Sequence, residues 1–137
     1  MTEAGVSIAR RGVRWAWLPW AAAILFFSVA PPGWILAAVP RSGWSLASTA
    51  GHIVEFGLFA LLVWMALPAE DSVGRQVVAS GAASVAFGLG IELIQLAIPY
   101  RSFDLRDWAA DVGGTAAVLL VLSVRRCRRA AAPSRHR

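Results

Sequence analysis

Four apolar runs, each free of lysine and arginine, alternate with polar segments along the chain. They cover residues 15–30, 50–67, 77–98 and 108–124. A helix needs about 20 mostly apolar residues to cross the hydrocarbon core of a bilayer. The pattern therefore predicts an all-α membrane protein, a four-transmembrane-helix bundle. The first span is the shortest. At 1.5 Å per residue its helix would be only about 24 Å long.

Prolines, glycines and charged residues mark the connections between these runs. Pro31 and Pro32 lack a backbone donor and disfavour helix in the residue before them, so they end the first span. Residues 33–49 contain Trp34 and Trp44, side chains typical of the membrane interface, and we expect a loop on the outer membrane surface. The remaining predicted segments are two short connections, residues 68–75 and 99–106, and a disordered basic tail after residue 124.

The composition excludes most classes of soluble protein. Hydrophobic residues make up 58% of the 137 residues and charged residues only 15%, whereas soluble domains are about a quarter charged. The chain is long enough for one compact domain. Its single cysteine, Cys127, excludes a disulfide framework and a cysteine-based metal site.

The basic residues, all of them arginine, indicate how the chain is oriented. They number 13 against 8 acidic residues, a balance that would suggest nucleic-acid binding in a soluble protein. Here nine lie at the two ends of the chain, and with Arg75 they place ten on one predicted side of the membrane and three on the other. The positive-inside rule then predicts that both termini are cytoplasmic.

These observations predict a multi-pass protein of the cytoplasmic membrane, with the lipid bilayer and not nucleic acid as its partner. The predicted organisation is a basic N-terminus at 1–14, a single transmembrane domain at 15–124 and a basic tail at 125–137. An alternative for the N-terminus is a signal peptide, with Arg10, Arg11 and Arg14 before an apolar region and a cleavage site at Ala30. Proline after that site opposes cleavage, and residue 31 lies outside in either case.

Small residues at steps of four predict where the helices pack, because close backbone approach drives helix association in lipid. The third span carries Ser80, Ser84 and Gly88, with Ala82, Ala86 and Gly90 on the adjacent stripe. The fourth span carries Ala109, Gly113 and Ala117. We expect these stripes to form the contacts between helices.

Ionisable residues within the spans gather at one predicted depth, near the outer surface. His52 and Glu55 open the second span, and Glu92 and Gln95 close the third. Asp104, Asp107 and Asp111 open the fourth span at positions i, i+3 and i+7. This spacing places them on one helical face. Polar groups inside a membrane are costly and usually functional. The candidate polar pocket is therefore His52, Glu55, Glu92, Gln95, Arg101, Asp104, Asp107 and Asp111.

The charges of this pocket do not balance. Five carboxylates face two local arginines, Arg101 and Arg106, so the others require protons, a cation or water. His52 is able to join such a site, to respond to pH, or to hydrogen-bond Glu92 or Asp111. The structural alternative is that these groups only bond one another to hold the helices together. The spacing matches no strong metal motif and no nucleophile motif is present, so we predict no metal or cofactor and leave enzymatic activity open.

The same residues resemble the VanZ-like family of small bacterial integral membrane proteins. The resemblance rests on a His-x-x-Glu-Phe segment, a Glu-x-x-Gln segment, an arginine, and Asp-x-x-x-Asp-x-x-Gly, and it covers about half the chain. In this sequence the motif residues are His52, Glu55, Phe56, Glu92, Gln95, Arg101, Asp107, Asp111 and Gly114. Members commonly have asparagine at position 111, and often have glycine where this chain has Val118.

The resemblance implies a protein of the cell envelope, and the founding member is associated with low-level resistance to the glycopeptide teicoplanin. It brings no defined biochemical mechanism. We therefore carry three hypotheses. The first is an outward-facing acidic pocket that binds or handles an envelope precursor or lipid head group. The others are a membrane-embedded enzyme that acts on a lipid-linked substrate through its carboxylates, and an accessory subunit of a membrane complex.

Overall fold

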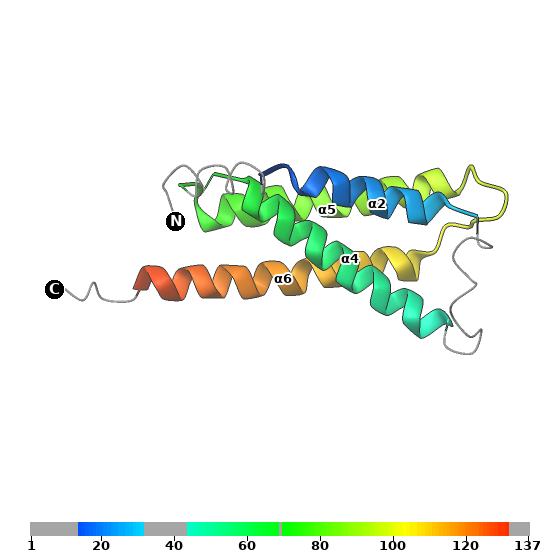
Figure 1. Cartoon of the computed structure of the whole chain (residues 1–137). Helices are drawn as coiled ribbons and strands as arrows, with labels where there is room; N and C mark the ends of the chain where they lie inside the picture. The colour runs from blue at the N-terminus through cyan, green and yellow to red at the C-terminus, as the bar shows by residue number, and fades with distance from the viewer. Residues whose placement is uncertain (1–13, 32–43, 69, 132–137) are drawn as a thin grey trace, which may run out of the picture.

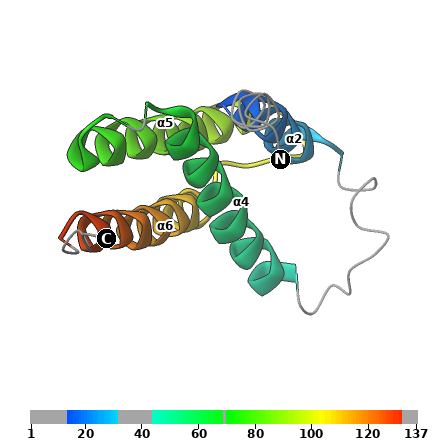
Figure 2. The ribbon, with the colours of Figure 1, turned by 60° about the vertical axis from the view of Figure 1, so that its left-hand side comes forward.

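The computed structural model describes residues 14–31, 44–68 and 70–131, and every regular element in these ranges is a helix. α4 contacts α6 most extensively, α5 packs against both, and α2 lies against α4 and α5. The N-terminal end of α4 projects away from the other helices in both views (Figures 1 and 2). The four labelled helices are α2 (Trp17–Val29), α4 (Trp44–Ala66), α5 (Val73–Gln95) and α6 (Leu105–Ala131).

Successive helices run in opposite directions, so the bundle has two distinct ends. We call the end where α4 and α6 begin and α5 finishes the His52 end, and the opposite end the Arg126 end. By length and composition, three of the described segments are able to cross a membrane: Ser48–Ala66 within α4, all of α5, and all of α6. α2 is apolar but has only 13 residues. The described chain is thus that of an all-α, multi-pass membrane protein.

The two middle helices begin four to six residues before the predicted spans 50–67 and 77–98. α4 begins at Trp44, so the last six residues of the expected loop are helical. α5 begins at Val73 because the Ser72 hydroxyl accepts a hydrogen bond from the Arg75 N–H and so caps the helix. It ends at Gln95, four residues before Pro99, whose ring would clash with the carbonyl at that distance. An apolar run marks the segment of a helix that contacts lipid. It does not show where the helix begins and ends.

The predicted disordered tail was also wrong as far as residue 131. α6 continues without a break through the arginines after Val124. Arginine and alanine are strong helix formers, and positive charge near a helix C-terminus interacts favourably with the helix dipole. Outside the described residues lie the basic segment 1–13, the loop residues 32–43 and the tail residues 132–137, and with them Arg10 and Arg11 of the alternative signal peptide.

The apolar core joins α2, α4 and α5. Ile24, Phe56, Phe59 and Ile91 are buried together, and the rings of Phe59 and Phe87 lie 4.9 Å apart between their centroids. α6 joins the bundle by close backbone contact instead. A Cβ on Gly114 would collide with the carbonyl of Ile53, so only glycine allows α4 and α6 to approach this closely.

One predicted packing stripe was confirmed and two were wrong. Ser80, Ser84 and Gly88 are buried along α5, while Ala82 and Ala86 beside them are exposed. On α6 the expected stripe of Ala109, Gly113 and Ala117 is exposed. The buried face of α6 carries Asp111, Gly114 and Thr115 instead. Small residues occur on several faces of this helix, and the cost of turning a carboxylate toward lipid selects the face that carries Asp111.

Candidate functional site

His52 of α4 connects two carboxylates of α6. Its Nδ1 lies 2.8 Å from Oδ1 of Asp111, and its Nε2 lies 3.5 Å from Oδ2 of Asp107. The two aspartates are one helical turn apart and so face the same imidazole. The Asp107 side chain keeps 28% of its surface exposed and that of Asp111 only 3%, so the cluster leads from the surface into the bundle.

A glycine on α5 makes room for the buried aspartate. A Cβ on Gly88 would lie 2.8 Å from Oδ2 of Asp111 and 3.1 Å from Cε1 of Phe56. The Asp111 carboxylate therefore contacts His52 through one oxygen and faces α5 through the other. Three helices meet at this residue, which explains why it is almost fully buried.

Two further carboxylates hold the beginning of α6. Glu92 is 1% exposed, and its Oε2 accepts a hydrogen bond of 2.8 Å from the backbone N–H of Asp104. The Asp104 side chain accepts another, of 2.8 Å, from the N–H of Arg106, as a helix N-cap does. Both acids therefore satisfy backbone donors that the first turn of a helix leaves free. Glu92 also lies within electrostatic range of Asp107.

Glu55 lies one helical turn beyond His52 on α4 and is half-buried. It is within electrostatic range of His52 and of Asp111. Its backbone carbonyl accepts a hydrogen bond of 3.0 Å from the indole of Trp20, which ties α4 to α2. Asp107 and Asp111 thus contact the histidine, and Glu55 and Glu92 lie within electrostatic range of it.

Two predicted pocket residues turn away from the acids and bind the end of α2. Arg101 donates to the carbonyls of Phe27 and Ala30, at 3.1 and 2.8 Å, and Gln95 donates to the carbonyl of Ser28 at 3.0 Å. The last carbonyls of a helix have no partner within it, and a cation there interacts favourably with the helix dipole.

The expectation that Arg101 and Arg106 offset two of the five carboxylate charges was therefore wrong. In the described ranges the ion pairs at this end of the bundle involve His52. The side chain of Arg106 is exposed. The carbonyls at the end of α2 compete for Arg101, because Pro31, which follows, offers no N–H to them.

Sequence reasoning missed a second polar cluster at the Arg126 end. Gln76 of α5 is 2% exposed, donates to the carbonyl of Pro68 at 2.9 Å and accepts a hydrogen bond from Arg126. Arg126 also donates to the carbonyl of Asp71 at 2.8 Å, and the Asp71 side chain pairs with Arg75. The available signal was that Gln76 continues the buried stripe of Ser80 and Ser84.

The acids are not arranged as ligands of an ion. In the residues that the structure describes, no three of the histidine, cysteine, aspartate and glutamate side chains are placed to hold a metal. The site is instead a hydrogen-bonded cluster of one imidazole and several carboxylates. Such an arrangement presents acceptors to a ligand that carries donors.

The family model of VanZ/LLP1 matches residues 10–126, which include the site and most of every helix. The chain belongs to the VanZ/LLP1 family. No curated protein and no solved structure matches the chain. In this VanZ/LLP1 protein the histidine and the second aspartate of the motif are in direct contact. Val118, at a position where members often have glycine, packs with its Cγ2 beside Gly57 of α4.

Proposed function

We propose that the His52 end of this VanZ/LLP1 protein is an outward-facing acidic site that binds the polar head group of an envelope lipid or lipid-linked precursor. The observation that carries the proposal is the meeting of Asp107 and Asp111 on His52. Ionisable groups within membrane helices are costly and are retained mainly where they serve a function. Here they come from helices far apart in the sequence.

The ligand of such a site carries hydrogen-bond donors or positive charge. The carboxylates within range of His52 provide acceptor oxygens and a negative potential, which attract an ammonium group more strongly than neutral hydroxyl groups. Exposure falls from Asp107 at the entrance to Asp111 within the bundle. A head group with an amine, a sugar or a peptide amine matches this chemistry.

The arrangement of arginines supports the proposed outward orientation of the site. The Arg126 end carries Arg75 and the arginines of the last turns of α6, and such residues remain on the cytoplasmic side. We propose that α2 is the fourth crossing, with thinning of the bilayer around its 13 residues. Both termini are then cytoplasmic, and the membrane is the bacterial inner membrane.

Cys127 tests this orientation directly. It is the single cysteine of the sequence and is exposed on α6. We expect a membrane-impermeant maleimide to label it in inverted membrane vesicles and not in intact spheroplasts. A cysteine placed at the exposed Ser102, in a Cys127→Ser background, provides the opposite pattern as a control. Labelling of Cys127 in intact spheroplasts would overturn the proposed orientation.

The binding proposal is tested with the purified protein in nanodiscs. The probes are phosphatidylethanolamine and a lipid-linked disaccharide-pentapeptide, with phosphatidylglycerol as the head group without an amine. We expect at least tenfold weaker binding of an amine-bearing probe after Asp107→Asn. Asp71→Asn, at the opposite end, should bind as the wild type does. Equal binding by the two variants, or equal binding of all three lipids, contradicts the proposal.

A cellular experiment tests the link to glycopeptides that the family suggests. We propose that occupation of the site by an envelope precursor changes susceptibility to teicoplanin. A deletion strain is complemented with wild type, Glu92→Gln or Asp71→Asn, and the accumulated protein is quantified. Loss of complementation by Glu92→Gln at normal accumulation supports a binding role. Loss of accumulation instead assigns Glu92 to helix packing, and no change in susceptibility removes the proposed link to resistance.

A further inference from the structure

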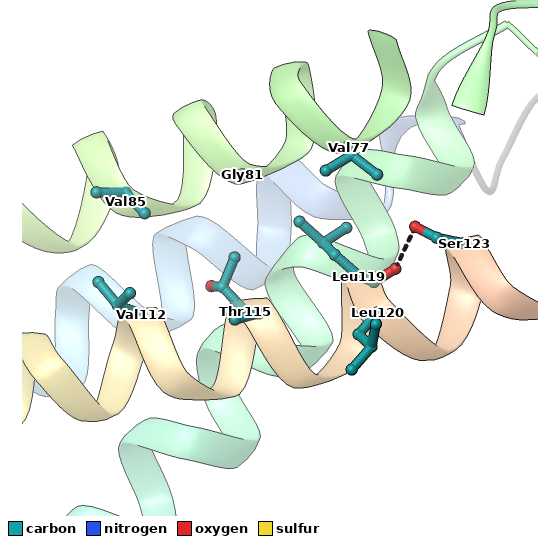
Figure 3. Close-up of a pocket in the computed structure, with 9 residues that line it drawn as sticks. Val77, Gly81, Val85, Val112, Thr115, Leu119, Leu120 and Ser123 are labelled. Carbon is teal, nitrogen blue, oxygen red and sulfur yellow. Dashed lines mark hydrogen bonds between the residues drawn. The ribbon is translucent and has the colours of Figure 1, made fainter. Parts of the chain in front are cut away.

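An apolar groove runs between α5 and α6 (Figure 3). None of the residues of the acidic cluster lines it. Its volume is about 400 Å³. Gly81 forms part of its floor, where a Cβ would lie 3.5 Å from Cδ1 of Leu119. The walls that matter here are Val77 and Val85 of α5 with Val112 and Leu120 of α6. All of them lie in segments long and apolar enough to cross a membrane.

Thr115 is the polar residue in the wall of this groove that lacks a partner. It is 3% exposed, and its Oγ1 has no hydrogen bond in the part of the chain that the structure describes. Ser123, at the far end of the same groove, differs because its hydroxyl donates to the carbonyl of Leu119 at 2.6 Å. A buried hydroxyl without a partner is costly, so an acceptor supplied by an occupant would stabilise Thr115.

The groove begins within one helical turn of the acidic cluster. On α6, Val112 follows Asp111 directly and Thr115 comes four residues after it. On α5, Val85 lies one turn before Gly88, which faces the Asp111 carboxylate. Trp108 donates to the carbonyl of Val85 at 3.4 Å and so links the two helices at this end. The groove and the acids therefore lie within about one helical turn of each other along both helices.

The order of chemistry along α6 matches the order of chemistry along a lipid. Asp111, Thr115 and Leu119 follow one another on the buried face in steps of about 6 Å. Their side chains carry a carboxylate, a hydroxyl and a hydrocarbon, and of the three Thr115 and Leu119 line the groove. The parts of a membrane lipid come in the same order: a head group with donors, an ester or phosphate oxygen that accepts, and an acyl chain.

We propose that the groove holds one hydrocarbon chain of an outer-leaflet lipid whose head group lies at the His52 cluster and whose linking oxygen accepts from Thr115. This inference rests on the proposed function and specifies its ligand as an amphiphile. The groove is too small to enclose a whole helix of a second copy. From Val112 to Ser123 it is about 16 Å long, and a helix about 10 Å across would need roughly 1,200 Å³ over that length.

Neighbouring alanines on α6 provide a matched pair of variants. Ala116 and Ala117 are both exposed, but Ala116 lines the groove and Ala117 does not. We expect Ala116→Leu to lower retention of the lipid at least tenfold and Ala117→Leu to change it less than twofold. Thr115→Val keeps the shape of the side chain and removes the hydroxyl, and it should weaken retention about threefold to tenfold.

The experiment uses the full chain in nanodiscs and two probes with the same head group. One is phosphatidylethanolamine with a diazirine in its acyl chain, and the other is water-soluble glycerophosphoethanolamine. On irradiation, the lipid probe should crosslink to the groove residues of α5 and α6. Ala116→Leu should abolish these crosslinks and leave binding of the soluble probe intact. Asp107→Asn should weaken both probes.

The outcomes separate the groove from the head-group site. Equal crosslinking by wild type, Ala116→Leu and Ala117→Leu contradicts the proposal that the groove binds a lipid chain, because ordinary annular lipid would give this result. Crosslinks that join two protein chains at α5 and α6 also overturn it, in favour of a second copy. Crosslinks that Ala116→Leu removes while Asp107→Asn leaves both probes unaffected support the groove and contradict the proposed head-group site.

Discussion

Nδ1 of His52 and Oδ1 of Asp111 lie 2.8 Å apart although 59 residues separate them in the sequence. The contact joins α4 to α6 inside segments able to cross a membrane. Asp111 is almost fully buried, and Gly88 of α5 leaves the space that its carboxylate occupies. The pair therefore links the acidic site to the packing of three helices.

A double-mutant cycle measures this link. We expect His52→Ala and Asp111→Ala to couple by about 0.6–1.7 kcal/mol in unfolding, which is from the average to the largest coupling measured for hydrogen bonds between membrane helices. Asp111→Asn should retain most of the stability, because its amide oxygen still accepts a hydrogen bond. His52→Ala combined with Asp71→Ala, at the opposite end, should be additive within about 0.5 kcal/mol. Additivity of the first pair would show that the contact contributes nothing.

Gly88 and Gly90 form a matched pair on α5. A Cβ at position 88 would meet the Asp111 carboxylate and Phe56, whereas nothing lies within 4 Å of a Cβ at position 90. We expect Gly88→Ala to displace Asp111, to weaken head-group binding and to destabilise the fold by about 1–3 kcal/mol. Gly90→Ala should do neither. Detergent unfolding and the phosphatidylethanolamine binding assay report the two effects, and equal behaviour of the variants contradicts the arrangement.

Gly114 and its neighbour Gly113 form a second matched pair of glycines, on α6. They test whether close backbone contact with α4 requires glycine at position 114. The substituent of an alanine at 114 would collide with the backbone of Ile53 on α4, and at 113 it would meet nothing within 4 Å. Because backbone cannot move aside as a side chain does, Gly114→Ala should separate α4 from α6 and cost about 3 kcal/mol or more. Gly113→Ala should be neutral or slightly stabilising. Thermal unfolding in detergent, followed by circular dichroism, compares the two.

The convergence of the acids could be predicted from the sequence because it depends on topology alone. Once the spans alternate in direction, the start of α4, the end of α5 and the start of α6 meet at one end of the bundle. Which groups touch depends on the rotation of each helix and on competing partners. His52 contacts Asp107 and Asp111, whereas Arg101 donates to a carbonyl at the end of α2. The pattern of apolar residues does not predict whether Arg101 bonds the carboxylates or the carbonyls of α2.

The ends of the helices depend on local capping that hydropathy does not report. Ser72 begins α5 through a side-chain hydrogen bond, and Asp104 and Glu92 begin α6. The extension of α6 past Val124 was missed because arginines after an apolar run were interpreted only as a charge signal. Their second role is structural, since Arg126 bonds to the turn before α5.

Arg101 is expected to act on α2 and not directly on the acids. Arg101→Ala removes the donors to Phe27 and Ala30, so the end of α2 should detach. Hydrogen exchange of residues 26–30 should become at least tenfold faster, with global unfolding changed by about 1–3 kcal/mol. Arg106→Ala removes an exposed side chain and is the control. If both variants exchange like wild type, Arg101 does not hold α2, and the apolar contacts of α2 with the hydrogen bonds of Trp20 and Gln95 are sufficient.

Arg126 is expected to fasten α6 to the turn between α4 and α5. It donates to the side chain of Gln76 and to the carbonyl of Asp71. Arg126→Ala leaves the amide oxygen of Gln76 buried without this donor, which costs about 1–3 kcal/mol. Arg125→Ala, an exposed neighbour, should change stability by less than about 0.5 kcal/mol.

Hydrogen exchange locates the effect of Arg126. Amides of residues 70–76 should exchange faster in Arg126→Ala, while those around Glu92 and Asp104, at the other end of the bundle, should not change. A simple loss of positive charge would affect Arg125→Ala and Arg126→Ala equally. Faster exchange confined to Arg126→Ala and to the turn therefore assigns the last turns of α6 a structural role beyond membrane orientation, and equal exchange in the two variants removes that role.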